Sequence, residues 1–89
     1  MNKKQSAKLI IQLEKDKKII HVYKKKLSDG NYALAVFNFG ETEENVKISL
    51  EETSLVRDVW KKENIGALPA IDINTYPHTV RIFKVIKNK

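Results

Sequence analysis

The stretch His21-Val-Tyr-Lys-Lys-Lys-Leu-Ser-Asp-Gly-Asn-Tyr-Ala-Leu-Ala-Val-Phe-Asn-Phe39 decides the fold of this chain. It joins two apolar runs, residues 19–23 and 32–39, through Ser28-Asp-Gly-Asn31, and Asp-Gly between such runs is a strong hairpin signal. The second run alternates, with Tyr32, Leu34 and Val36 on one side and Ala33, Ala35, Phe37 and Phe39 on the other. Because both sides are apolar, we predict a central antiparallel strand that needs cover on both faces.

Length and composition bound the class of protein. The chain has 89 residues, of which 42% are apolar and 31% charged, as expected for one soluble globular domain over residues 1–89, with frayed ends at 1–7 and 87–89. It contains no run of about eighteen apolar residues, so we expect no membrane partner. The apolar run at residues 9–11 is too short for a signal-peptide core, and the compartment stays undetermined. Cysteine is absent, which excludes a disulfide framework and a thiolate metal site.

The formal charge of +6 arises from 17 basic and 11 acidic residues. Most of the excess is lysine spread along the chain, with a local run at Lys24–Lys26. Arginine, which suits phosphate recognition better, occurs only as Arg57 and Arg81. We therefore interpret the charge as solvated faces and expect no nucleic-acid partner.

The N-terminal part allows two interpretations. Residues 8–13 alternate as a strand does, with Leu9, Ile11 and Leu13 on one side. Residues 6–18 also favour a helix by propensity. The polar break at residues 14–17 has hairpin length, however, and β-branched residues follow it directly. We predict a hairpin.

Downstream of the central strand, short alternating segments are separated by polar turns. We predict strands at residues 46–50, 54–60, 71–74 and 79–86. At 40–45 we predict a hairpin turn, in which the glycine is able to take a positive φ. An irregular stretch is expected at 61–68, because Gly66 is permissive and Pro69 limits pairing. Such spacing predicts an all-β fold, an antiparallel Greek-key β-sandwich of seven to eight strands.

The sequence offers no convergent catalytic groups. Glu41, Glu43 and Glu44 cluster in a turn, where carboxylates are hydrated. The two histidines, His21 and His78, have no spacing that suggests a metal. Asp29 and Asp58 have structural explanations, Asp29 in the Asp-Gly turn and Asp58 as an acceptor of backbone N–H groups at the end of its strand. We expect a catalytically inert chain with no cofactor and no metal.

Aromatic residues are the remaining candidates for a contact site. Tyr23, Tyr32, Trp60 and Tyr76 could stack on sugar rings, yet packing in the core explains large aromatic residues more often. We favour core packing for Trp60, at the rim of the core, and for Tyr76. The candidate residues for an interdomain or carbohydrate contact are Tyr32, Phe39, Trp60 and Tyr76.

Three ordered segments carry a family resemblance: residues 22–30 (Val-Tyr-Lys-Lys-Lys-Leu-Ser-Asp-Gly), 33–40 (Ala-Leu-Ala-Val-Phe-Asn-Phe-Gly) and 56–60 (Val-Arg-Asp-Val-Trp). With these, the chain from Val22 to Val85 resembles the C-terminal β-sandwich domain of the α-galactosidase (melibiase) family of glycoside hydrolases. The chain departs from the family pattern at four positions: Tyr23 replaces tryptophan, Lys26 proline, Phe39 arginine and Thr79 glycine.

The resemblance implies a non-catalytic accessory domain. In that family the two catalytic aspartates lie in a (β/α)₈ barrel that precedes the sandwich, so no catalytic residue is carried onto this chain. The implied partner is the barrel of the same parent enzyme, which would cover the outer apolar face and account for Tyr32 and Phe39. The resemblance also allows contacts in a homo-oligomer.

One alternative is a carbohydrate-binding module that recognises galactosides through Tyr32, Trp60 or Tyr76. The substrate of the parent enzyme, its oligomeric state and whether Met1 is a native start are left open by the sequence.

Overall fold

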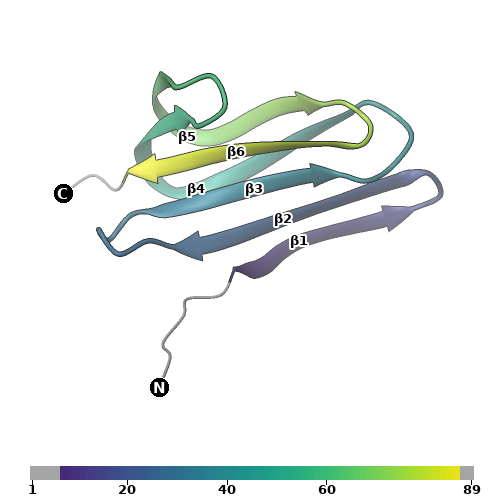
Figure 1. Cartoon of the computed structure of the whole chain (residues 1–89), viewed down its shortest axis with the longest axis horizontal. Coiled ribbons are helices and arrows are strands. Elements are labelled where there is room, and N and C mark those ends of the chain that lie inside the picture. The colour runs from purple at the N-terminus through teal and green to yellow at the C-terminus, as the bar shows by residue number, and fades with distance from the viewer. Residues whose placement is uncertain (1–6, 87–89) are drawn as a thin grey trace.

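The computed structural model describes residues 7–86, which form six β-strands (Figure 1). The strands are β1 (Lys8–Lys15), β2 (Lys18–Lys26), β3 (Tyr32–Asn38), β4 (Glu44–Asp58), β5 (Glu63–Thr75) and β6 (Thr79–Ile86). They pair antiparallel in the order β1-β2-β3-β6-β4-β5. β6 therefore lies between β3 and β4, a non-sequential order of the kind that Greek-key connections produce. The all-β antiparallel prediction is confirmed. Of the ends predicted to fray, 1–6 and 87–89 lie outside the described residues.

Two long strands turn the single hydrogen-bonded sheet into a sandwich. The end of β4, Leu55–Asp58, pairs with β6, whereas its first part, Glu44–Ser49, pairs only with β5. The first part of β4 and the end of β5 lie across the inner face of β2, β3 and β6 and bury it. The core comprises Ile20, Val22, Tyr32, Leu34, Val36, Val46, Ile48, Val56, Ile71, Phe83 and Val85.

The predicted β1–β2 and β2–β3 hairpins are confirmed, and the β2–β3 turn explains the register. The hairpin predicted at residues 40–45 is wrong, because β3 pairs with β6 and the connection at 40–45 carries the chain to the other layer. In the β2–β3 turn Gly30 has a φ of 88°, and the Asp29 carboxylate accepts a hydrogen bond from the backbone N–H of Asn31 (3.0 Å). Tyr32, Leu34 and Val36 then point into the core, while the alternate residues of β3 are half-buried on its other face. The alternation predicted for this strand is therefore correct.

The number of strands was predicted wrongly. Residues 46–50 and 54–60 were expected as separate strands with a loop at 51–53, but β4 runs continuously through all of them up to Asp58. The β4–β5 register shifts between Ser49 and Ser54, so a bulge stands where a turn was expected. The chain thus has six strands rather than seven to eight.

The irregular stretch predicted at 61–68 is also wrong, because β5 begins at Glu63. Gly66 takes a φ of 129° beside a register shift, and Pro69 lies within the irregular part of the pairing. Since β5 is an edge strand, a residue without an N–H costs it little there.

A buried polar network ties β3 to the start of β4 and the end of β5. The Asn38 side-chain amide donates to the Thr42 carbonyl (3.0 Å) and to the Thr75 hydroxyl (3.1 Å), and its oxygen accepts from the backbone N–H of Gly40 (2.9 Å). The Thr75 hydroxyl in turn donates to the Glu44 carbonyl (2.8 Å). Asn38 therefore fixes the connection that carries the chain from one layer to the other.

Candidate interaction surface

The outer face of the larger layer is apolar and lies opposite the core. Because side chains alternate along a strand, the residues between the core positions of β2, β3 and β6 all point to this face. No strand of residues 7–86 packs over it, yet it carries few charges near its centre. Its apolar members are Ile19, Tyr23, Ala33, Ala35, Phe37, Leu55, Val80, Ile82 and Ile86. We call this surface, together with Phe39, the outer face.

An aromatic cluster occupies the β2–β3 side of the outer face. The Phe37 and Phe39 rings are stacked with centroids 5.2 Å apart, and Tyr23 meets Phe37 edge-on at 5.6 Å. The His21 ring meets Phe39 edge-on at 5.3 Å. Phe39 remains 47% exposed, so the cluster presents a fixed aromatic ring to the exterior. We call these four residues the aromatic cluster.

Polar groups border the aromatic cluster on the β1 side. His21 Nε2 lies 2.9 Å from Glu14 Oε2, and the Gln12 side-chain amide donates to the same oxygen (3.0 Å). The hydrogen bond from His21, followed by the one from Gln12, holds the pKa of the Glu14 carboxyl below its usual value. The cluster is therefore apolar at its centre and hydrogen-bonding at its rim, as protein interfaces commonly are.

The structure does not bring the four predicted contact residues together. Phe39 is on the outer face, whereas Tyr32 is buried on the inner face. Trp60 lies in the β4–β5 turn and Tyr76 in the β5–β6 turn, with exposed fractions of 66% and 61%. The prediction that Trp60 and Tyr76 pack in the core is therefore wrong. β4 ends at Asp58, so its alternation does not extend to Trp60.

Three members of the aromatic cluster were not among the predicted contact residues. His21 pairs with Phe37, and Tyr23 pairs with Ala35, in the β2–β3 register. The sequence shows that His21 and Tyr23 are two residues apart, as are Phe37 and Phe39, so each two share one face of their strand. The missing information was the register that places the two strands side by side.

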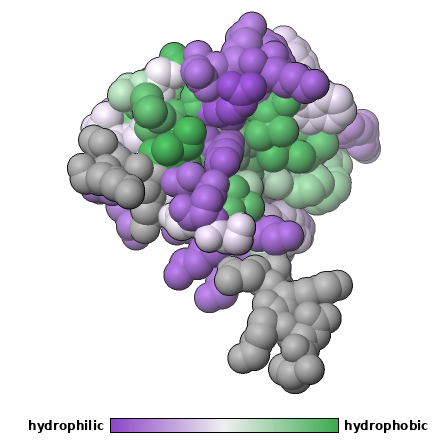
Figure 2. Space-filling model, turned by 60° about the vertical axis from the view of Figure 1, so that its left-hand side comes forward, coloured by the Kyte–Doolittle hydropathy of each residue, from purple (hydrophilic) through white to green (hydrophobic). Residues whose placement is uncertain are grey.

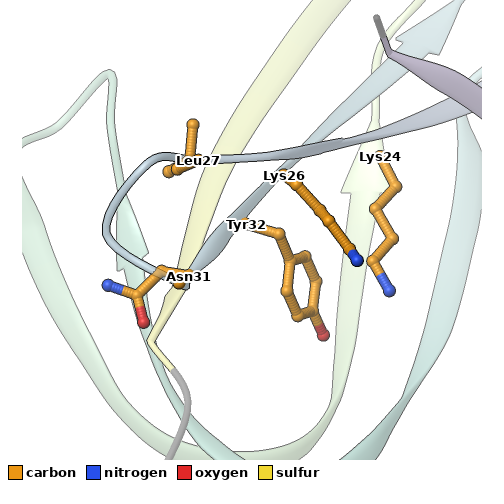
Figure 3. A pocket seen from close by; sticks show the side chains of 6 residues that line it. Lys24, Lys26, Leu27, Asn31 and Tyr32 are labelled. Atoms are coloured by element: carbon orange, nitrogen blue, oxygen red, sulfur yellow. The ribbon is translucent and has the colours of Figure 1, made fainter. Parts of the chain in front are cut away.

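A shallow hollow of about 160 Å³ lies at the β2–β3 turn, and the Tyr32 side chain lines it (Figure 3). The amino groups of Lys24 and Lys26 extend along the same side of the hairpin as the Tyr32 ring, and Lys24 Nζ lies 4.3 Å from the ring centroid. Burial, and then the negative charges of Glu51 and Glu52, raise the pKa of the Tyr32 hydroxyl. Because Lys24 covers one face of the ring, this hollow is a poor platform for a sugar ring.

The buried carboxylate of Asp58 has a structural role. It accepts hydrogen bonds from the backbone N–H of Lys61 (3.1 Å) and from the Arg81 guanidinium (3.0 Å). Burial by itself would raise the pKa of Asp58, but these donors and the N–H of Trp60 outweigh it and hold the pKa below its usual value. The predicted role of Asp58 as an acceptor at the end of its strand is confirmed.

Within residues 7–86 no group of three or more histidine, aspartate or glutamate residues is placed to hold a metal ion. The same residues include no helix that is long and apolar enough to cross a membrane. Figure 2 turns the molecule so that the left-hand side of Figure 1 comes forward. In this view hydrophobic side chains form two areas, and a hydrophilic band divides them. The apolar side chains visible in this view thus form two separate areas.

Comparison with known proteins identifies the fold and the family. The family described as the alpha galactosidase C-terminal beta sandwich domain matches residues 17–85. Among solved structures, a β-L-arabinopyranosidase from Geobacillus stearothermophilus superposes with a TM-score of 0.78 and 24% identity, over 92% of this chain and 19% of that one. The α-galactosidase I of Mortierella vinacea gives a TM-score of 0.71 and 19% identity, over 89% of this chain and 22% of that one.

The same fold also occurs in an Anoxybacillus α-amylase, with a TM-score of 0.67 and 16% identity over 96% of this chain and 18% of that one. This chain therefore spans about a fifth of the length of the structures that it resembles. The comparison with curated proteins gave no match.

Proposed function

This chain belongs to the family of α-galactosidase C-terminal β-sandwich domains, and on that premise we propose that it packs against a catalytic barrel through its outer face and stabilises that barrel. The family is that of the non-catalytic C-terminal domain of glycoside hydrolases, as the sequence predicted.

The observation that carries the proposal is the uncovered outer face. A sheet with one face in solvent normally alternates apolar and polar residues, but β3 places Ala33, Ala35 and Phe37 on the side away from the core. Tyr23 on β2 and Val80 and Ile82 on β6 continue this apolar surface across three strands, and Phe39 extends it at the end of β3. Leu55 is also exposed on this face, but Lys84 and Arg57 separate it from that area. Exposed apolar surface that is continuous over several strands is typical of a protein interface.

The geometry also suits a permanent contact. The aromatic rings of the outer face hold one another in place through stacked and edge-on contacts, so their ordering costs little when a partner binds. The partner implied by the family is the barrel that precedes the sandwich in the same parent enzyme. Covering the exposed half of Phe39 would contribute about 1 kcal/mol, since burying a whole phenylalanine side chain contributes about 1.5 to 3 kcal/mol.

Thermal unfolding of the separately expressed barrel, with and without this chain, tests the proposal. At a chain concentration one hundred times the dissociation constant, the barrel should gain about 2.7 kcal/mol of stability. The variant Phe39→Lys should raise the dissociation constant, and so the chain concentration needed for the same stabilisation, about tenfold or more. It removes about 1 kcal/mol of burial and places an ammonium group in the contact.

Leu13→Lys provides the matched control. Leu13 is exposed to nearly the same extent as Phe39, 45% against 47%, but it belongs to the inner side of β1. If the barrel midpoint does not respond to the chain, or if both lysine variants weaken the response equally, the outer face is not the docking surface.

A carbohydrate-binding role is the second candidate, and the exposure of Trp60 and Tyr76 favours it. Exposed rings in turns are available for stacking on sugars. Trp60 is the only tryptophan, so its fluorescence reports directly on that turn. Saturable quenching by galactose-containing oligosaccharides would support this role, whereas an unchanged spectrum up to millimolar sugar would exclude Trp60 as a contact.

A further inference from the structure

Strand β1 forms one edge of the sheet and is unusually apolar for an edge. Leu9, Ile10 and Leu13 are 42%, 44% and 45% exposed, and β2 is the only strand that pairs with β1 among the described residues. An exposed edge strand with apolar side chains is a template for pairing with another chain. In natural proteins charged residues or proline usually prevent an edge strand from pairing with another chain. The middle of β1, residues 9–13, contains neither.

The backbone groups that β1 leaves free can be identified from the ladder. The Ile19 carbonyl accepts a hydrogen bond from Phe39 (2.8 Å), so the backbone groups of Ile19 point toward β3. Glu14 is the β1 partner of Ile19. In an antiparallel pair bonded and non-bonded positions alternate, so the N–H and C=O groups of Glu14 and Gln12 point away from β2 toward the free edge.

The inner side of β1 is also incompletely covered. A hollow of about 170 Å³ lies between β1 and the first part of β4, lined by Ile11, Leu13, Ile20 and residues 44–47. The second layer consists only of the first part of β4 and the end of β5, so it stops short of β1. A side chain entering beside Ile11 and Leu13 from another strand would extend the core.

We propose that β1 pairs with β1 of a second copy of this chain, antiparallel about a two-fold axis, to give one continuous sheet. A two-fold axis makes the pairing antiparallel and self-complementary. The register that satisfies both faces places Gln12 opposite Gln12. Ile11 then lies opposite Leu13 twice on the inner side.

Neighbouring registers are less complementary. Moving the axis to Ile11 places Leu9 opposite Leu13, but the bulge between Leu9 and Ile11 puts these two on different faces. Moving the axis to Leu13 places Ile11 opposite Lys15 and keeps a single apolar pair, Leu13 with Leu13. A second copy is chosen as the occupant because its β1 supplies inward-facing apolar partners for both Ile11 and Leu13, beside the hollow that these two residues line.

Sedimentation velocity over a concentration series from about 10 μM to 1 mM, with amide hydrogen exchange at both ends, tests the pairing. We expect a reversible dimer in which the amides of Gln12 and Glu14 become protected at high concentration. Gln12→Pro should weaken dimerisation at least tenfold, since it removes an N–H that the monomer does not use. Gln12→Thr keeps that N–H and is the matched control.

Circular dichroism of Gln12→Pro should retain the β-sheet spectrum. Leu13→Lys supplies a second variant that leaves the backbone intact and places a charge at the paired edge. A chain that stays monomeric up to 1 mM, or dimers that survive both Gln12→Pro and Leu13→Lys, would overturn the proposal. Protection of Gln12 only when the barrel is added would also overturn it, in favour of the parent enzyme as the occupant of this edge.

Discussion

Replacing Gly40 by alanine should destabilise the sandwich for a purely steric reason. A Cβ at residue 40 would lie 2.2 Å from the carbonyl oxygen of Lys17 and 2.8 Å from the backbone nitrogen of Ile19. Both contacts are backbone atoms of the β1–β2 hairpin, so no side chain can rotate away. Two hydrogen bonds cross the same contact, from Phe39 N–H to the Ile19 carbonyl (2.8 Å) and from Glu41 N–H to the Lys17 carbonyl (3.0 Å).

The expected cost follows from these contacts. Overpacking costs about 1 to 3 kcal/mol, and each hydrogen bond that lengthens costs up to about 1.5 kcal/mol. We therefore expect Gly40→Ala to lose about 2 to 4 kcal/mol, which for a domain of this size lowers the midpoint of thermal unfolding by roughly 10 to 30 °C. Unfolding in urea, followed by far-UV circular dichroism, is the suitable assay because Trp60 is exposed and its fluorescence reports packing poorly.

Gly30→Ala is the control for this prediction. Gly30 has a φ of 88°, and a methyl group on its Cα would meet no atom within 4 Å, so alanine there suffers only conformational strain of about 1 to 2 kcal/mol. Gly40 lies outside the positive-φ region. If Gly40→Ala costs less than Gly30→Ala, or if the amide of Glu41 keeps its protection from hydrogen exchange, the steric argument fails.

Three further predictions concern buried polar groups. Asp58→Asn should cost about 2 kcal/mol at pH 7 through loss of its charged hydrogen bonds. Because the folded pKa lies below the usual 3.8, the difference from the parent chain should shrink as the pH falls past 3.8 and vanish only below the folded pKa, as measured by urea unfolding at several pH values. Asn38→Ala should cost about 2 to 3 kcal/mol, because it leaves buried backbone groups unpaired, and urea unfolding with a normal m-value would confirm it. The hydroxyl of Tyr32 should ionise at lower pH when Glu51 and Glu52 are both changed to glutamine, because their charges raise its pKa; an unchanged titration of tyrosine absorbance would contradict this.

Much of the fold was predictable because its signals are local. The alternation of residues 32–39 separated core positions from outer positions, and Asp29-Gly30 marked the turn that sets the register of β2 against β3. The ordered segments from Val22 to Trp60 were enough to indicate the family. A period of two and a turn residue act within a few positions of each other, so both can be recognised without any knowledge of distant contacts.

The candidate surface was predicted only in part. Phe39 was identified because β3 is apolar on both sides, and it does lie on the outer face. Its neighbours His21 and Tyr23 belong to another strand, and their contact with Phe37 and Phe39 depends on the register. Trp60 and Tyr76 were misplaced because hydrophobicity favours burial, whereas both lie in turns that the chain forms for other reasons.

The sequence by itself determined that this protein is all-β, where its central hairpin turns and which side of β3 enters the core. Only the tertiary structure decided that residues 46–50 and 54–58 form one strand, because β5 pairs with both segments and bridges the bulge between them. Tertiary structure also decided the role of Gly40, which is needed for the close approach of the β1–β2 hairpin and not for a positive φ. The physical reason is the same in both cases: strand continuity and close packing depend on atoms that lie far away in the chain, and a local pattern carries no information about them.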